Sequence, residues 1–250
     1  MGRVFLRFYG ELNDFLPPAI RQRTLQAALD GPTSTKSAIE SCGVPHTEVD
    51  LVLVNGEPAT LATPVAEGDR VSVFPRFRSL APDPQHRLQP PPTVEARFVL
   101  DVHLGRLASY LRLAGFDTAY RNDCSDQELA AISGRDDRML LTRDRELLKR
   151  SVVARGYWLR HTEPRRQFVE VVRAFGLAGR IAPFTRCARC NTPLEAVSRQ
   201  AVIDRLPPRV RIGRDEFLRC SGCGRVYWDG THVEKIRQFF SLALAEPPEA

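Results

Sequence analysis

Residues 96–147 read ARFVLDVHLGRLASYLRLAGFDTAYRNDCSDQELAAISGRDDRMLLTRDREL, and short apolar strands alternate in this stretch with helical patterns. One helical pattern closes on Gly115, and another begins after Ser125 with Glu128 at the capping-box position. Strands that alternate with helices favour a parallel sheet covered by helices, which is an α/β fold. The expected strands are 96–104, 117–120 and 138–144, and the expected helices are 105–116 and 125–133.

Acidic side chains follow two of these expected strands. Asp101 comes directly after the apolar residues 98–100, Asp144 follows residues 139–143 in the same way, and the helix between them begins with Asp126. In open α/β sheets, sites form beyond the carboxyl ends of the parallel strands. Carboxylates that gather there need a cation to neutralise them, and Mg²⁺ and Mn²⁺ prefer oxygen ligands. The pattern predicts a Mg²⁺ or Mn²⁺ site that hydrolyses phosphodiesters, with Asp101, Asp126 and Asp144 as its catalytic residues.

Each of these carboxylates also has a purely structural interpretation. Asp126 and Glu128 suit a helix N-terminus because the helix dipole favours negative charge there. Asp101 and Asp144 suit the N-caps of the helices that follow them. The residues taken one by one leave both interpretations open, whereas the grouping at two strand ends favours a site.

Arginines beside the strand ends are candidate ligands for phosphate, because a guanidinium makes bidentate contacts with phosphate oxygens. Arg143 and Arg145 flank the second strand-end aspartate, and Arg106 and Arg112 lie in the helix after the first. The alternative is that these side chains cover solvated helix faces. We expect phosphate or RNA contact from Arg143, Arg145 and Arg106.

Four cysteines form two pairs with metal-ligand spacing. Cys187 and Cys190 make one Cys-x₂-Cys pair, and Cys220 and Cys223 make the other, with 29 residues between the pairs. Four thiolates bind Zn²⁺ tetrahedrally and leave no open position, so one structural zinc is expected. Redox catalysis by a Cys-x₂-Cys pair is the alternative, but neither pair has the strand-then-helix setting of such enzymes. Residues 181–243 are therefore expected to form a Cys₄ zinc ribbon.

Two aromatic residues follow the second cysteine pair. Tyr227 and Trp228, with Arg219 and Arg225 nearby, could stack on nucleic-acid bases. They could equally form the small core that a zinc ribbon needs. Both interpretations stay open from the sequence.

Residues 1–78 predict a small α+β domain. Strands are expected near residues 4–10, 21–25, 49–54 and 67–77, with a helix between Thr33 or Ser34 and Gly43. This order resembles the ubiquitin-like β-grasp fold, close to the small sulfur-carrier proteins. Those carriers end in a free Gly-Gly, whereas this chain continues through residues 75–78, so the resemblance implies an interaction module. Five prolines then predict an extended linker over residues 79–96.

The patterns LD.HLGRLA.YLRLAGFDT, LLTRDREL and C..CN…C..CG..YW.G.H resemble the Mut7-C family, whose RNase domain is PIN-like and carries a C-terminal zinc ribbon. The N-terminal part resembles the ubiquitin-like module that is often fused to this domain. The resemblance implies a metal-dependent RNase fold over residues 97–180, with the three aspartates at the PIN-type acidic positions. Because PIN nucleases often use four acidic positions, the fourth is left open among Asp123, Glu128 and Glu146.

Composition adds limits on partners and location. Residues 151–250 hold 17 Lys and Arg against 10 Asp and Glu, and nearly all the basic residues are Arg. A basic segment is typical of nucleic-acid contact, although a GC-rich genome also favours Arg. No apolar run approaches the roughly 20 residues that span a membrane, and the start MGRVFLRFYGEL lacks the apolar region of a signal peptide. We expect a cytoplasmic protein without a membrane partner.

These observations predict a metal-dependent ribonuclease whose zinc ribbon aids RNA binding. The alternative from another class is a non-catalytic adaptor that keeps the PIN-like fold and binds RNA or protein. In either case the N-terminal domain is expected to offer a surface for a protein partner.

Overall fold

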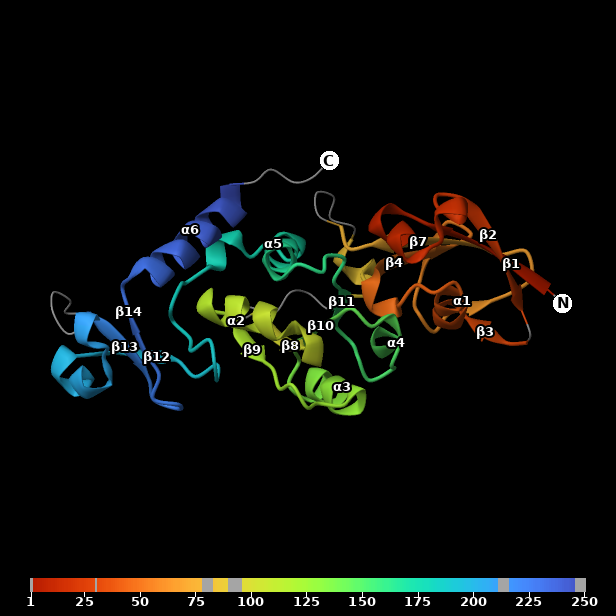
Figure 1. Ribbon diagram of the computed structural model, residues 1–250. Coiled ribbons are helices and arrows are strands. Elements are labelled where there is room, and N and C mark those ends of the chain that lie inside the picture. The colour runs from red at the N-terminus through yellow and green to blue at the C-terminus, as the bar shows by residue number, and fades with distance from the viewer. Residues whose placement is uncertain (1, 30, 78–82, 90–95, 211–215, 246–250) are drawn as a thin grey trace. The chain divides into compact units, whose positions relative to one another are not determined.

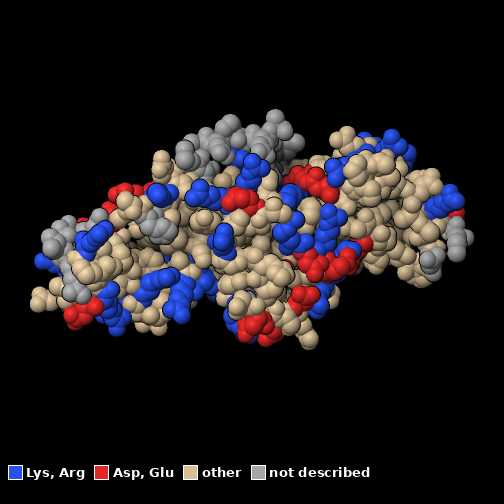
Figure 2. Space-filling model, viewed as in Figure 1, with Lys and Arg blue, Asp and Glu red and all other residues tan. Residues whose placement is uncertain are grey.

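The computed structural model describes residues 2–29, 31–77, 83–89, 96–210 and 216–245 (Figure 1). The chain divides into two units. The first unit holds residues 1–93 and 124–158, and the second holds residues 94–123 and 159–250. Both units carry basic and acidic side chains on the face drawn in Figure 2. The expected domain bounds 1–78, 97–180 and 181–243 follow the order of the chain and stay a prediction.

A five-stranded sheet forms the N-terminal part of the first unit. Its strand order is β2–β1–β7–β4–β5, in which β1 and β7 are parallel and the other pairs are antiparallel. This is the α+β arrangement expected from the sequence, with helix α1 after the first hairpin. The bounds are β1 Gly2–Phe8, β2 Thr24–Leu29, β3 Thr33–Ser34, α1 Thr35–Ser41, β4 Val49–Val54, β5 Glu57–Ala59, β6 Pro64–Val65 and β7 Arg70–Pro75.

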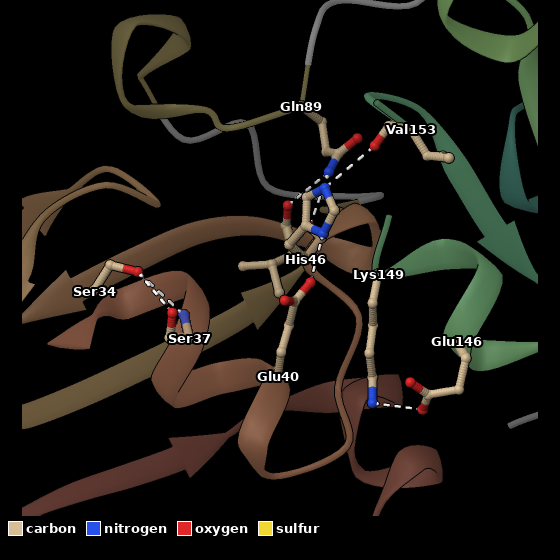
Figure 3. Close-up of polar contacts among 9 residues, drawn as sticks. Ser34, Ser37, Glu40, His46, Gln89, Glu146, Lys149 and Val153 are labelled. Carbon is tan, nitrogen blue, oxygen red and sulfur yellow. Dashed lines mark hydrogen bonds and ion pairs between the residues drawn. The ribbon is translucent and has the colours of Figure 1, made fainter. Parts of the chain in front are cut away.

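Local signals in the sequence account for these elements. Val4, Leu6 and Phe8 alternate along β1 and are buried in the core of the N-terminal module (residues 2–29 and 31–77). Ser34 caps α1, because its hydroxyl accepts a hydrogen bond from the amide of Ser37 at 3.2 Å (Figure 3). The β4–β5 turn lies at Asn55-Gly56, where φ is +53° and +92°, and such left-handed angles suit these two residue types.

Residues 124–158 also belong to the first unit. They form α3 (Asp126–Arg135), β10 (Met139–Thr142), α4 (Arg145–Leu148) and β11 (Gly156–Trp158), and β10 pairs with β11 in parallel. All four residues of β10 are buried, as expected for a strand that is covered on both faces. The expected strand 138–144 and helix 125–133 are therefore confirmed, with small shifts of their ends.

The segment 124–158 packs directly on the N-terminal module. His46, between α1 and β4, contacts Glu40 through Nδ1 at 2.7 Å and the carbonyl oxygen of Val153 through Nε2 at 3.2 Å (Figure 3). The carboxylate of Glu48 accepts a hydrogen bond from the amide of Trp158, at the end of β11. These contacts join the N-terminal module to part of the expected nuclease domain within one unit.

The described part of the expected linker packs on the same module. Residues 83–89 contain a 3₁₀ helix at Pro84–His86, and Arg87 makes an ion pair with the buried carboxylate of Asp50 at 2.7 Å. Gln89 is buried and donates to the carbonyl of Val49 at 2.9 Å. The remainder of residues 79–96, apart from residue 96, lies outside the described residues, so the linker bounds stay a prediction.

The second unit contains a second parallel strand pair. Strand β8 (Arg97–Leu100) leads into helix α2 (Gly105–Leu113), which returns to β9 (Asp117–Ala119) beside β8. Helix α5 (Pro164–Ala174) packs on α2, and Phe168 of α5 contacts Phe239 and Phe240 of helix α6 (Thr231–Ala245). The order strand, helix, strand is the one expected from residues 96–120.

The C-terminal part of the second unit is a three-stranded antiparallel sheet. Its strands are β12 (Leu194–Val197), β13 (Phe217–Cys220) and β14 (Val226–Trp228), with β13 in the centre. The long insert between β12 and β13 contributes Val202 and Leu206 to a small core with Phe217. The insert thus connects the antiparallel strands β12 and β13, as a zinc ribbon requires. No helix among the described residues is long and apolar enough to cross a membrane.

Candidate metal centre and acidic residues

The two cysteine pairs form turns of the same shape. In each turn the residue after the second cysteine is left-handed, with φ of +70° at Asn191 and +71° at Gly224. The carbonyl of the first cysteine accepts a hydrogen bond from that residue's amide, at 2.9 Å in both turns. Asn and Gly are the residues that adopt this conformation most easily, which explains their places next to Cys190 and Cys223.

The four sulfur atoms fit one tetrahedral metal. All four Sγ atoms lie within 4.8 Å of one another, and the Cys190–Cys220 and Cys187–Cys223 pairs are 3.3 and 3.6 Å apart. Zn²⁺ with four thiolates at ~2.3 Å would place the sulfurs about 3.8 Å from one another. The cluster could therefore hold zinc with little movement, as the spacing of the cysteines predicts.

The thiols of this cluster differ in acidity. Burial raises the pKa of the Cys190 thiol, but hydrogen bonds with Thr192 and Cys220 outweigh it and lower the pKa to about 6. Burial and the neighbouring sulfurs raise the pKa of Cys223 to about 12. Four thiolates this close repel one another, and a divalent cation removes that repulsion because it binds them all.

Tyr227 supports the first cysteine turn. Its hydroxyl oxygen lies 3.3 Å from Cys187 Sγ and accepts a hydrogen bond from the amide of Ala188 at 3.0 Å. Trp228 packs against the small ribbon core. Both side chains therefore have the structural role that the sequence left open, and base stacking by either stays a prediction.

A side chain of α2 reaches into the same turn. Arg112 is 4% exposed, and its Nη1 donates to the carbonyls of Arg189 at 2.8 Å and Ala188 at 3.2 Å. These two residues separate Cys187 from Cys190. The sequence suggested phosphate contact or a solvated helix face for Arg112, and both are wrong because the guanidinium is buried against the cysteine turn.

The acidic residues of the first unit lie at helix starts. Asp144 is the N-cap of α4 and accepts a hydrogen bond from the amide of Glu146 at 2.8 Å. Glu128 closes a capping box with Ser125 at the start of α3. Asp126, in the first turn of α3, lies 3.8 Å from Arg150. The structural interpretation is thus confirmed for Asp144 and Glu128, and it does not exclude a metal at the same oxygens.

The acidic residues of the second unit have other surroundings. Asp101 follows β8 and is 8% exposed, and its side chain makes no capping hydrogen bond to the helix after it. Asp123 is exposed and pairs with Arg121 at 2.9 Å. Because Asp101 and Asp123 belong to a different unit from Asp126 and Asp144, the convergence of these carboxylates stays a prediction.

The candidate phosphate ligands also differ from one another. Arg143 and Arg106 are exposed. Arg145 instead donates through Nη1 to the carbonyl of Phe15 at 3.0 Å, and its guanidinium lies over the ring of Trp158. The sequence offered no signal for this contact, because Phe15 precedes Arg145 by 130 residues.

Comparison with known protein families matches both parts of the chain. The model described as the Mut7-C RNAse domain matches residues 96–240, and the model described as Mut7-C ubiquitin matches residues 1–81. The first match alone covers more than half of the chain, and the two follow the order expected from the sequence.

Two solved structures resemble part of the chain. The crystal structure of H. volcanii small archaeal modifier protein 1 is 21% identical, with a TM-score of 0.25, and the match covers 31% of this chain and 100% of that one. The crystal structure of SAMP1 from Haloferax volcanii is 22% identical, with a TM-score of 0.25, and the match covers 30% of this chain and 97% of that one. No curated protein matches the chain.

Proposed function

Because the chain belongs to the Mut7-C RNase domain family and begins with the Mut7-C ubiquitin domain, we propose that it is a metal-dependent ribonuclease. The family supports a nuclease-like role, and the finer proposal is hydrolysis of RNA phosphodiester bonds. The observation that carries it is that Asp101 and Asp144 closely follow the carboxyl ends of strands β8 and β10. Each of these strands has a parallel partner, β9 for β8 and β11 for β10.

In this proposal Asp101, Asp126 and Asp144 hold Mg²⁺ or Mn²⁺ through carboxylate oxygens. The bound ion would lower the pKa of a water molecule and neutralise charge on the phosphoryl oxygens. A fourth carboxylate would come from Asp123, Glu128 or Glu146, all of which are exposed. Thr142 helps to position Asp144, because its hydroxyl accepts a hydrogen bond from the Asp144 amide at 2.9 Å.

Arg143 and Arg106 are the stronger candidates for contact with phosphate. Both side chains are exposed, whereas the guanidinium of Arg145 is already bound to the N-terminal module. An exposed arginine side chain can make the bidentate contact that a phosphodiester offers.

RNA contact by the ribbon is supported by a hollow of about 750 Å³ beside Tyr227 and Trp228. Its lining includes Arg209 and Arg225, with no carboxylate among the described residues that line it. Figure 2 shows further basic side chains over the part that holds β12–β14. An aromatic wall beside two cations suits a single-stranded nucleotide, because the base can stack and the phosphate can pair.

A second candidate function is a non-catalytic adaptor for RNA or protein. The observation that favours it is that Asp144 and Glu128 have capping roles at helix starts, which an inactive fold would also keep. The ubiquitin domain would then supply the surface for a protein partner.

Cleavage of labelled single-stranded and structured RNA with Mn²⁺ separates the two functions. Asp144→Asn is the informative variant, because asparagine caps a helix about as well as aspartate and the fold is kept. Asp204→Asn, at an exposed position of the ribbon insert, is the matched control. Cleavage by the wild type and the control but not by Asp144→Asn supports the nuclease. No cleavage by any of them, with salt-sensitive RNA binding, supports the adaptor.

A further inference from the structure

We propose that Arg112 is the buried counter-charge of the cysteine-bound metal, so that zinc binding orders α2 and β9 of the RNase domain as well as the ribbon. Arg112 would thus link the zinc centre to the α/β fold. This link does not depend on whether the acidic residues cleave RNA.

The first observation is the contact set of the Arg112 guanidinium. Besides the two carbonyls of the first cysteine turn, its Nε donates to the carbonyl of Thr118 in β9 at 2.9 Å. One buried side chain of α2 therefore binds the next strand and the metal-binding turn at the same time. The turn can keep these carbonyls in place only while its own conformation is fixed.

A second contact joins the same parts independently. Asn191, the left-handed residue that closes the turn, donates through Nδ2 to the carboxylate of Asp117 at 2.7 Å. Its Oδ1 accepts a hydrogen bond from the amide of Thr118 at 3.0 Å. The side chain of Asn191 thus satisfies a backbone donor of β9 from within the cysteine turn.

The third observation is the positive charge of the buried Arg112 guanidinium. The hydrogen bonds of Arg112 all end on main-chain carbonyls, which are neutral, and a buried guanidinium needs a negative charge nearby. Zn²⁺ with four thiolates has a formal charge of −2. Burial lowers the pKa of Arg112, and Cys190 and Cys187, followed by Tyr120 and Asp117, raise it again. The metal-bound thiolates are therefore the natural partner of this cation.

Loss of zinc would act on the RNase domain through these contacts. The cysteine turn would lose the ligand that fixes it, and Arg112 and Thr118 would lose their partners in it. Helix α2 begins four residues after Asp101, so disorder in residues 105–119 would reach the neighbourhood of a proposed catalytic residue.

Amide hydrogen exchange of the full-length wild-type protein tests the link directly. Zinc removal by a chelator should speed exchange of residues 105–119 by about 10-fold or more, along with the ribbon, while residues 2–29 keep their rate. Exchange that rises in residues 186–228 alone would overturn the proposal, because the ribbon would then be an independent module.

Zinc affinity of variants, measured by competition with a chromogenic chelator, tests the two side chains. Arg112→Met should weaken zinc binding by about 10- to 100-fold, as the loss of outer-shell partners does, and Arg112→Lys should restore part of it through the charge. Arg106→Met, on the exposed face of the same helix, is the matched control and should bind zinc as the wild type does.

Asn191→Gly keeps the left-handed backbone and removes the amide alone, so it tests the second contact even if Arg112→Met does not fold. It should weaken zinc binding and speed exchange of the Thr118 amide. Wild-type zinc affinity in both Arg112→Met and Asn191→Gly would overturn the proposal.

Discussion

The guanidinium carbon of Arg145 lies 4.3 Å from the ring centroid of Trp158, and Nη1 of the same group donates to the carbonyl of Phe15. The contact joins α4 to the N-terminal module within the first unit. The ubiquitin-like part is thus packed on a segment of the RNase family domain, as the contacts of His46 and Glu48 also show.

Arg145→Met should lower the free energy of unfolding of the protein by about 2 kcal/mol, because a cation–π contact and a charged hydrogen bond are lost. Arg23→Met, at an exposed position of the same unit, should change it by less than about 0.5 kcal/mol. Urea denaturation followed by Trp fluorescence measures both. Equal effects of the two substitutions would contradict the assigned role of Arg145.

Cys220→Ser should abolish zinc binding, because three thiolates and a hydroxyl hold the metal far less well than four thiolates. Metal analysis should find about one zinc per chain in the wild type and in Cys42→Ser, whose thiol lies outside the cluster. Zinc that persists in Cys220→Ser at the wild-type ratio would be incompatible with a four-thiolate site.

Tyr227→Phe should weaken zinc binding by about 10-fold while the ribbon stays folded, since the hydroxyl contacts both Cys187 Sγ and the Ala188 amide. Chelator competition gives the affinity, and circular dichroism checks the fold. If Tyr227→Phe binds zinc as tightly as the wild type, the hydroxyl has no part in the site.

Stability should fall as the pH drops from 7 to 5 because of His46. Burial lowers the pKa of His46, and its hydrogen bond to Glu40 opposes this only in part, while Lys36 adds to the lowering. A histidine that binds its proton less readily when folded stabilises the fold above its unfolded pKa of about 6.5 and loses that contribution in acid. His46→Gln should flatten the pH dependence of the urea midpoint, and an unchanged slope would show that other groups cause it.

Local signals in the sequence predicted much of the fold. The caps at Ser34 and Ser125, the Asn55-Gly56 turn and the spacing of the four cysteines each act over a few residues, so they can be read without the tertiary structure. The burial of Arg112 and Arg145 could not be predicted in this way. Their partners, Ala188 and Phe15, lie 76 and 130 residues away, and the choice between a solvated and a buried guanidinium depends on those partners.

The sequence also does not decide the role of the acidic residues. The sequence placed Asp101 and Asp144 at strand ends, and the structure has them there. A cap and a metal ligand use the same oxygens, so position alone does not decide between the two roles. Of these two residues Asp101 is the more informative, because its side chain caps no helix.

The most direct test of the proposed function is therefore the single-turnover rate of Mn²⁺-dependent RNA cleavage by the wild type and by Asp101→Asn. Zinc content and urea midpoint are measured on the same samples, so that a folding defect is recognised. We predict that the wild type cleaves and that the variant, with zinc retained, is slower by ~100-fold or more. Equal rates in the two proteins would contradict the assignment of the acidic site.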